Sequence, residues 1–375
     1  MPMGRISVPK IHTGDHLAKR PAISDLPTAV SLLTQLLDHA AGNLLAISGA
    51  GISCSYRFPS PARGAKGVPM FCQSYIINKS YRPIFFQLSE NIEFLEVGSH
   101  SFRIRYWARS YLGYPTVRAA EPNVGHYALA ALMKMGYIRH LITQNVDRLH
   151  HKAIGVKQDP SQPDYFQSHP NILELHGTLK HVNCLSCGHQ MDRDDFQDLL
   201  SELNPSWKDY ADTLQSIGQE VKTNPDGDAD VKDRSFDSFV VPNCEKCRVG
   251  LLKPAVTFFG ESLSKEAKEE SNVRVREAKG LLLLGTSLTT YSAFRLVKEL
   301  KEDKSRTQQI GMINIGATRA DALVDWKIGS HLDSGGLGCS QVLKEAALHL
   351  AARNRLPPSH PVFGLLNSGL IKPPD

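Results

Sequence analysis

The residues whose spacing speaks most clearly for chemistry are four cysteines in two Cys-x-x-Cys pairs. The pairs are Cys184 with Cys187 and Cys244 with Cys247. Zinc takes four soft ligands at the corners of a tetrahedron, and each pair offers two thiolates from one tight turn. Four thiolates leave no open position for water, so we predict one structural Zn²⁺. Two unrelated pairs, or redox-active dithiols, are the alternatives.

A glycine-containing loop is the second candidate. Residues 44–48 read Leu-Leu-Ala-Ile-Ser, which is typical of a buried strand, and the chain continues directly as Gly49-Ala50-Gly51-Ile52-Ser53. Glycines permit a tight turn and a close approach to the pyrophosphate of a dinucleotide. The third glycine of the usual fingerprint is missing, so this loop alone is weak evidence.

Polar residues follow the next predicted strand, 137–143. Gln144, Asn145 and Asp147 are well placed for a ligand there, although a capped loop is the alternative, because Asn and Asp favour turns. About thirty residues later comes His176, followed by Gly177. Its imidazole could serve as a general base, since histidine titrates near neutrality. A structural histidine is the alternative.

Strands alternate with helices along the chain. Apolar runs predict strands over 44–48, 137–143, 281–284 and 310–315, and helical spacing predicts helices over 26–37, 124–135, 265–278 and 292–302. Each predicted strand ends in glycine or small polar residues. This pattern predicts an α/β fold with a doubly wound parallel sheet, in which the strand ends face one ligand crevice.

Composition sets the bounds. The chain has 375 residues and a net charge of +5, without a block of Lys or Arg, so we expect no nucleic-acid partner. No apolar run approaches the length of a membrane span. Seven cysteines, an odd number, argue against a secreted disulfide framework. Between Cys187 and Cys244 stand thirteen acidic and five basic residues, and we interpret the acidic stretch Asn224–Asp230 within this insertion as a solvated loop.

Taken together and in order, these motifs resemble those of the sirtuin family of NAD-dependent protein deacylases, over roughly residues 26–350. The resemblance rests on 49–53, 144–147, 175–177, the two cysteine pairs, 253–261, 285–288 and 314–316. The segments 82–84, 105–109 and 122–126 are similar to the class II, mitochondrial branch.

The resemblance implies a role for each matching residue. Residues that would bind NAD are Gly49, Ala50, Gly51, Ser53, Arg57, Gln144, Asn145, Asp147, Gly285, Thr286, Ser287, Asn314, Gly316 and Cys339. His176 and Asn145 would be catalytic, with His176 as the general base. The acyl oxygen of the substrate lysine would attack the nicotinamide ribose carbon, and nicotinamide would leave. His176 would then activate a ribose hydroxyl, which attacks the resulting imidate, and water would release free lysine and O-acyl-ADP-ribose. The substrate peptide would lie as an added strand between Gly260-Glu261 and the 288–291 loop.

One segment departs from the family pattern. After Ser53 the family continues with an Asp before an aromatic residue and Arg, whereas this chain reads Ser55-Tyr56-Arg57. The missing acid normally helps to position the nicotinamide end. A gene-model error, a divergent working loop and a damaged site all explain it. A non-catalytic NAD-binding or scaffold protein is therefore the alternative function, whereas a nicotinamide dehydrogenase is disfavoured because the expected acidic residue after the loop is missing.

The expected boundaries follow from these assignments. We expect a disordered tail or targeting segment over 1–23, and a Rossmann-type domain formed by 24–177 and 255–350. A zinc-binding module with the acidic insertion would span 178–254, and an irregular tail 351–375. The resemblance also implies acyl-lysine proteins as substrates, mono-ADP-ribosyl transfer as a second activity, and the mitochondrial matrix as the location, with cytoplasm or nucleus as alternatives. The oligomeric state stays open.

Overall fold

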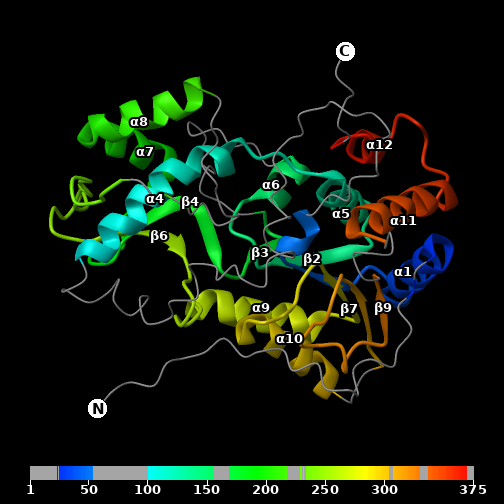
Figure 1. Cartoon of the computed structure of the whole chain (residues 1–375). Helices are drawn as coiled ribbons and strands as arrows, with labels where there is room; N and C mark the ends of the chain where they lie inside the picture. Colours follow the sequence, from blue (N-terminus) through cyan, green and yellow to red (C-terminus); the bar gives the residue numbers. More distant parts are fainter. Residues whose placement is uncertain are drawn as a thin grey trace.

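The computed structural model describes residues 23, 25–53, 100–155, 169–217, 229, 231, 234–303, 307–329 and 337–369 (Figure 1). Its larger sheet is formed by β1 (Leu44–Ser48), β2 (Ile138–Thr143), β3 (Ile172–Glu174), β7 (Gly280–Leu284), β8 (Gln309–Ile313) and β9 (Trp326–Ile328). Its smaller sheet is formed by β4 (Gly177–Cys184), β5 (Gln190–Asp192) and β6 (Leu252–Val256).

The larger sheet is parallel throughout, in the order β3-β2-β1-β7-β8-β9. The chain builds outward from β1 to β3 on one side and later from β7 to β9 on the other. The order therefore reverses between β1 and β7. Ligands of open α/β sheets bind beyond the carboxyl ends of the strands at such a point. The predicted doubly wound parallel sheet is confirmed.

Strand β1 divides its side chains between two hydrophobic cores on opposite faces of this sheet (Figure 1). Leu44 and Ala46 pack with α1 (Leu26–Ala40), α5 (Val124–Lys134) and α11 (Cys339–Arg353). Leu45 and Ile47 pack with α9 (Lys265–Glu277) and α10 (Tyr291–Glu302). Burial on both faces explains why the strands read as continuous apolar runs instead of alternating ones.

Helix caps begin two of the predicted helices where the sequence places them. The carboxylate of Asp25 accepts a hydrogen bond from Thr28 N at 2.8 Å at the start of α1. At the start of α5 the Asn123 side chain accepts one from His126 N, and its amide also donates to Ile52 O at 2.9 Å. Asn123 thus joins α5 to η1 (Ala50–Ser53), the turn of the glycine loop.

A small module combines the three-stranded sheet with α4 (His100–Ala119), α7 (Arg193–Leu203) and α8 (Pro205–Ser216) around its own core. Trp107 of α4 is fully buried there, 4.7 Å from the ring of Phe196, and it donates to Leu252 O at 3.1 Å. The expected boundaries assign α4 to the larger domain, but its core-facing side belongs to the small module.

The first part of the acidic insertion forms α7 and α8. Asp194 lies in the first turn of α7, where its negative charge interacts favourably with the helix dipole. It also accepts hydrogen bonds from Lys180 at 3.0 Å, Tyr114 at 3.0 Å and Arg118 at 3.3 Å. Part of the acidic charge is therefore neutralised inside the fold. Most of the segment 224–230, which we interpreted as loop, lies outside the described residues.

The expected irregular tail over 351–375 also differs from the structure. Helix α11 continues to Arg353, and α12 (Pro361–Leu366) follows, with His360 as its cap. Val362 and Leu366 are buried in the core that α5 and α11 share. Pro361 begins α12, at a position in the first turn that proline tolerates well.

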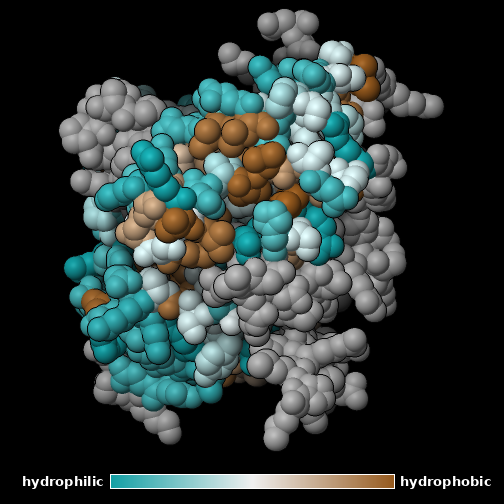
Figure 2. Space-filling view, turned by 90° about the vertical axis from the view of Figure 1, so that its left-hand side faces the viewer, coloured by the Kyte–Doolittle hydropathy of each residue, from teal (hydrophilic) through white to brown (hydrophobic). Residues whose placement is uncertain are grey.

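The outer face of the small module mixes hydrophobic and hydrophilic areas (Figure 2). Several apolar side chains of the module are exposed, among them Leu185, Ile217 and Val249.

Within the described residues, no helix combines the length and the apolar composition needed to cross a membrane. Helix α6 (Leu149–Ile154) lies between β2 and β3 in the chain and packs on α5.

Replacing Trp107 by alanine should destabilise the protein by about 3–5 kcal/mol, because it removes a fully buried indole and leaves a cavity between α4 and β6. Denaturant unfolding measures this free energy. Ile217→Ala, at a side chain that is 62% exposed, is the control and should change it by less than about 0.5 kcal/mol. A Trp107→Ala protein as stable as the native chain would show that α4 does not hold this core together.

Candidate functional site

The backbones that follow β1 and β7 touch at the reversal point of the sheet. Gly51 N donates to Gly285 O at 2.8 Å, and Gly49 N donates to Leu284 O at 3.0 Å. A Cβ on Gly285 would lie 2.3 Å from the Gly51 carbonyl carbon, and Gly285 has a φ of +54°. Only glycine satisfies both conditions. The two predicted loops therefore form one continuous backbone surface, and its lack of side chains permits the close approach of a pyrophosphate.

Gln144 and Asn145, after β2, fasten the neighbouring strand end to this surface. Gln144 Nε2 donates to Thr286 Oγ1 at 2.8 Å, and Gln144 N donates to Ser48 O at 2.9 Å. Asn145 Nδ2 donates to Gly49 O at 3.3 Å. The structure thus brings these two predicted residues directly against the glycine loops.

The carboxylate of Asp147 is already engaged within the protein. Its carboxylate accepts a hydrogen bond from Leu149 N at 3.0 Å at the start of α6, which is the capped-loop arrangement that we left open. Burial raises the pKa of Asp147 to about 6, against the opposing effect of that hydrogen bond. Its contact with a ribose stays a prediction.

The remaining predicted cofactor residues lie around the ends of β7 and β8. Ser287 is exposed, and Asn314 follows β8 with its amide donating to Ile315 O at 3.0 Å. Gly316 has a φ of +80°. Cys339 is buried at the start of α11, where its thiol donates to Ile313 O at 3.3 Å, and burial raises the pKa of this thiol to about 12. It is a protonated, unreactive thiol at neutral pH.

The segment in which the chain departs from the family pattern lies next to η1, outside the described residues. Ala50 and Ser53 belong to η1, and the Ser53 hydroxyl is buried, with no hydrogen-bond partner among the described residues. Arg57 lies outside the described residues, as does the rest of 54–99.

His176 has the geometry of a base. Its Nδ1 lies 3.3 Å from Gln144 O, and its Nε2 lies 2.8 Å from Ser292 Oγ. A carbonyl oxygen can only accept, so Nδ1 carries the proton and Nε2 presents a lone pair. Burial lowers the pKa of His176 below its ordinary 6.5, and the hydrogen bond to Gln144 offsets part of that shift. The imidazole is therefore neutral at pH 7 and able to accept a proton at Nε2.

Sequence reasoning missed Ser292, the residue whose hydroxyl donates to the Nε2 of His176. It lies in the first turn of α10, 116 residues away in the chain, so only the fold brings the two together. A serine just inside a predicted helix carries no signal that points to a particular histidine.

The other buried histidines fit the structural interpretation. Burial lowers the pKa of His126 to about 3 and that of His150 well below its ordinary value, so both rings are neutral. The rings lie 4.8 Å apart, and His150 Nε2 pairs with Ser48 Oγ at 2.9 Å. The contact with Ser48 supports the end of β1, directly before the glycine loop.

The four cysteines form one cluster, with all sulfur atoms within 4.8 Å of one another. Sγ of Cys184 lies 3.7 Å from that of Cys247, and Sγ of Cys187 lies 3.8 Å from that of Cys244. A tetrahedron of zinc–sulfur bonds about 2.3 Å long has sulfur–sulfur edges of about 3.8 Å. These separations fit a closed four-thiolate zinc site and exceed any disulfide bond.

Backbone groups complete this site. The NH groups of Ser186 and Cys187 donate to Cys184 Sγ, each at 3.4 Å, and Gly250 N donates to Cys247 Sγ at 3.3 Å. A Cβ on Gly250 would lie 2.2 Å from Cys184 Sγ. The donors suit negatively charged sulfur, so the fold prepares thiolates for a metal.

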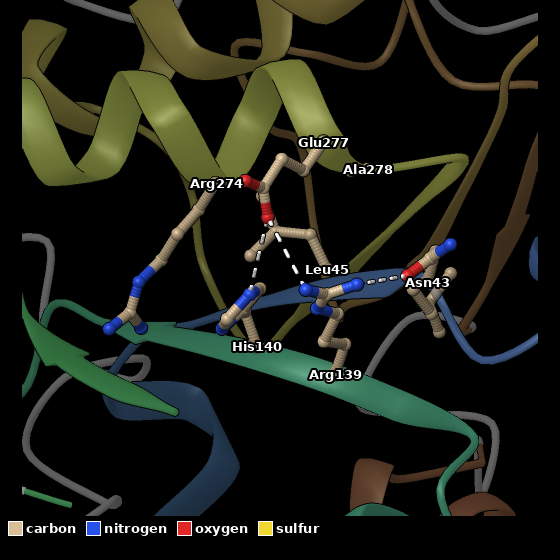
Figure 3. Close-up of a pocket in the computed structure, with 8 residues that line it drawn as sticks. Asn43, Leu45, Arg139, His140, Arg274, Glu277 and Ala278 are labelled. Atoms are coloured by element: carbon tan, nitrogen blue, oxygen red, sulfur yellow. Dashed lines mark hydrogen bonds and ion pairs between the residues drawn. The ribbon is translucent and has the colours of Figure 1, made fainter. Parts of the chain in front are cut away.

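The shallow depression in Figure 3 lies away from this site, at the amino ends of β1 and β2. There Glu277 pairs with Arg139 and His140, each at 3.8 Å, and Arg139 also donates to Asn43 Oδ1 (Figure 3). These contacts fasten the end of α9 to the sheet. The depression has no room for a ligand.

Comparison with known sequences adds to this geometry. The pattern of the Sir2 family matches residues 87–292. The chain is 38% identical over 322 residues to the NAD-dependent protein deacylase SIR4 of Batrachochytrium dendrobatidis, covering 85% of this chain and 93% of that protein. It is 35% identical over 286 residues to the NAD-dependent protein deacylase Sirt4 of Drosophila melanogaster, covering 76% and 78%.

Solved structures share the fold. A Sir2 homologue in complex with NAD superposes with a TM-score of 0.56 at 23% identity, covering 92% of this chain and all of that one. Sir2Tm bound to a propionylated peptide gives a TM-score of 0.53 at 21% identity, covering 88% and 99%.

The cysteine cluster should hold one zinc ion per chain, and Cys184→Ser should remove it and destabilise the fold, since the site links β4 to the segment before β6. Metal analysis by mass spectrometry together with a thermal melt measures both effects. Cys339→Ser is the matched control and should keep the zinc. A stably folded Cys184→Ser protein that holds no metal would contradict the structural role.

Proposed function

Because the chain belongs to the Sir2 family, we propose that it is an NAD-dependent protein-lysine deacylase in which His176 is the general base. The observation that carries the assignment of the base is the lone pair of His176 Nε2, held beside the surface formed by the glycine loops. NAD would supply the ribose carbon to which the acyl oxygen bonds as nicotinamide leaves.

The residues of this chain divide the work of holding NAD. The glycine contact between the loops after β1 and β7 would receive the pyrophosphate, since a backbone surface without side chains permits its close approach. Asn314 and Gly316 would lie at the adenosine end, and Gln144 and Asn145 at the nicotinamide ribose.

His176 would take the proton of a ribose hydroxyl at Nε2. Its Nδ1–H donates to Gln144 O, and this fixes both the tautomer and the ring orientation. Since Ser292 Oγ lies at hydrogen-bond distance from Nε2, the substrate hydroxyl must take the place of this contact when the base acts. In the free protein both ring nitrogens of His176 thus have hydrogen-bond partners, and the ring is already oriented for proton transfer.

The acyl-lysine peptide would lie between the turn at Gly260-Glu261 and the 288–291 loop. Thr257 N donates to His176 O at 2.8 Å, so this turn is attached to the backbone of the base itself. A peptide that adds there as a strand binds through main-chain hydrogen bonds, which read little of its sequence. Mono-ADP-ribosyl transfer, a zinc-filled cysteine site and a mitochondrial location stay predictions.

The native chain, incubated with NAD and an acetyl-lysine peptide, should release nicotinamide and deacylated peptide. In His176→Ala the formation of deacylated peptide should fall at least about 100-fold, the usual range for loss of a general base. Chromatography of both products is the measurement. His349→Ala, at an exposed histidine of α11, is the control and should keep full activity.

The alternative of a non-catalytic scaffold makes the opposite forecast. A native chain that binds NAD yet releases no nicotinamide would favour it and refute the deacylase. A family-type loop placed at 54–64 should then restore turnover if that loop is the defect.

The acidic limb of the rate profile should lie below pH 6.5. His176 must be unprotonated to act, and burial lowers its pKa below the ordinary 6.5 of a histidine. Protonation therefore removes the base only when the pH falls below that value. The measurement is kcat/KM for the acetyl peptide against pH. A limb centred clearly above pH 7 would contradict this environment of the base.

A further inference from the structure

The turn Phe258–Glu261 follows β6 and is closed by its own residues. Glu261 N donates to Phe258 O at 3.0 Å, and Gly260 has a φ of +89°, as a type II turn requires at its third residue. The Glu261 side chain folds back, and its Oε2 accepts from Phe258 N at 2.7 Å. Backbone and side chain of Glu261 thus both bind Phe258.

Lys253, within β6, holds the same turn from the strand side. Its Nζ donates to Glu261 Oε2 at 2.9 Å and to Val256 O at 2.5 Å. The ammonium also lies 4.3 Å from the centre of the Phe258 ring. One charge therefore contacts the end of the strand, the ring at the start of the turn and the carboxylate at its end.

This ion pair is shielded from water. The side chain of Lys253 is 11% exposed and that of Glu261 19%, whereas both members of the surface pair Lys301–Asp325 are 40% exposed. In a shielded pair, separating the two charges leaves each of them poorly solvated and without its partner. The two side chains are therefore held together more firmly than those of a surface pair. Burial lowers the pKa of Lys253, and Glu261 opposes this shift.

The held turn is also attached to the base. Thr257, between β6 and the turn, donates to His176 O, and Gly177 packs so closely on this strand that a Cβ there would lie 2.0 Å from Ala255 O. A displacement of the turn therefore changes the edge to which a peptide would add, beside the catalytic histidine.

We propose that Lys253 and Glu261 are positioning residues that hold the turn Phe258–Glu261 in the shape that receives the acyl-lysine peptide. The proposal rests on the proposed function, and it adds to it what prepares the peptide-binding edge. Strand addition needs main-chain donors and acceptors that already point in fixed directions, and a turn ordered before binding avoids an entropic cost at binding. The pair therefore controls affinity for the peptide and leaves affinity for NAD unchanged.

The test measures binding of a fluorescently labelled acetyl-lysine peptide to the full chain by anisotropy, alongside binding of NAD. Glu261→Gln keeps the shape and an acceptor oxygen but removes the charge, and Lys253→Met removes the ammonium. Each should raise the peptide Kd about tenfold and leave the NAD Kd unchanged. Lys253→Arg keeps the charge and should recover most of the affinity. Lys301→Met, which breaks the surface pair, should bind like the native chain.

An unchanged peptide Kd in Glu261→Gln and Lys253→Met would overturn the proposal, and so would a parallel loss of NAD binding, which would mean general misfolding. A native chain that does not bind the peptide would overturn it as well. Nicotinamide release by the native chain reports on the proposed function separately. A chain that releases nicotinamide but whose pair variants bind peptide normally is a deacylase without this positioning device.

Discussion

Direct contact between the backbones after β1 and β7 is the constraint on which the rest of the site depends. Gly49, Gly51 and Gly285 allow the two loops to touch, and the touching loops fix where the carboxyl ends of the central strands lie. Gln144 is held against these loops by its hydrogen bond to Thr286, and His176 is held in turn by its hydrogen bond to the Gln144 carbonyl. The orientation of the base therefore depends on a series of contacts that starts at three glycines.

Much of the fold was accessible from sequence because its signals are local. Strands buried on both faces appear as apolar runs, and the Asp25 and Asn123 caps lie within three residues of the groups they bind. Helix α4 was missed for an equally physical reason. It contains Pro115, and its buried face includes polar residues such as Arg103 and Ser110, so neither periodicity nor propensity favours it. Packing against the small module stabilises it instead.

The candidate site divides in the same way. Residues at strand ends were identified because ligand sites of parallel sheets lie there. The resemblance singles out His176, but no local physical signal does so. In the structure its contacts with Gln144 O and Ser292 Oγ distinguish it from the buried His126 and His150. The contact of Ser292 with the base and the pairing of Lys253 with Glu261 are likewise properties of the folded chain.

The small module is assembled from two separate stretches of chain, because α4 lies before β2 and the other elements lie after β3. An excised fragment over 178–254 would carry all four cysteines and yet lack the Trp107 side of its core. Such a fragment could neither be expected to fold alone nor be exchanged between related proteins as a cassette. Both stretches of the chain must therefore fold together before the core of the module can close.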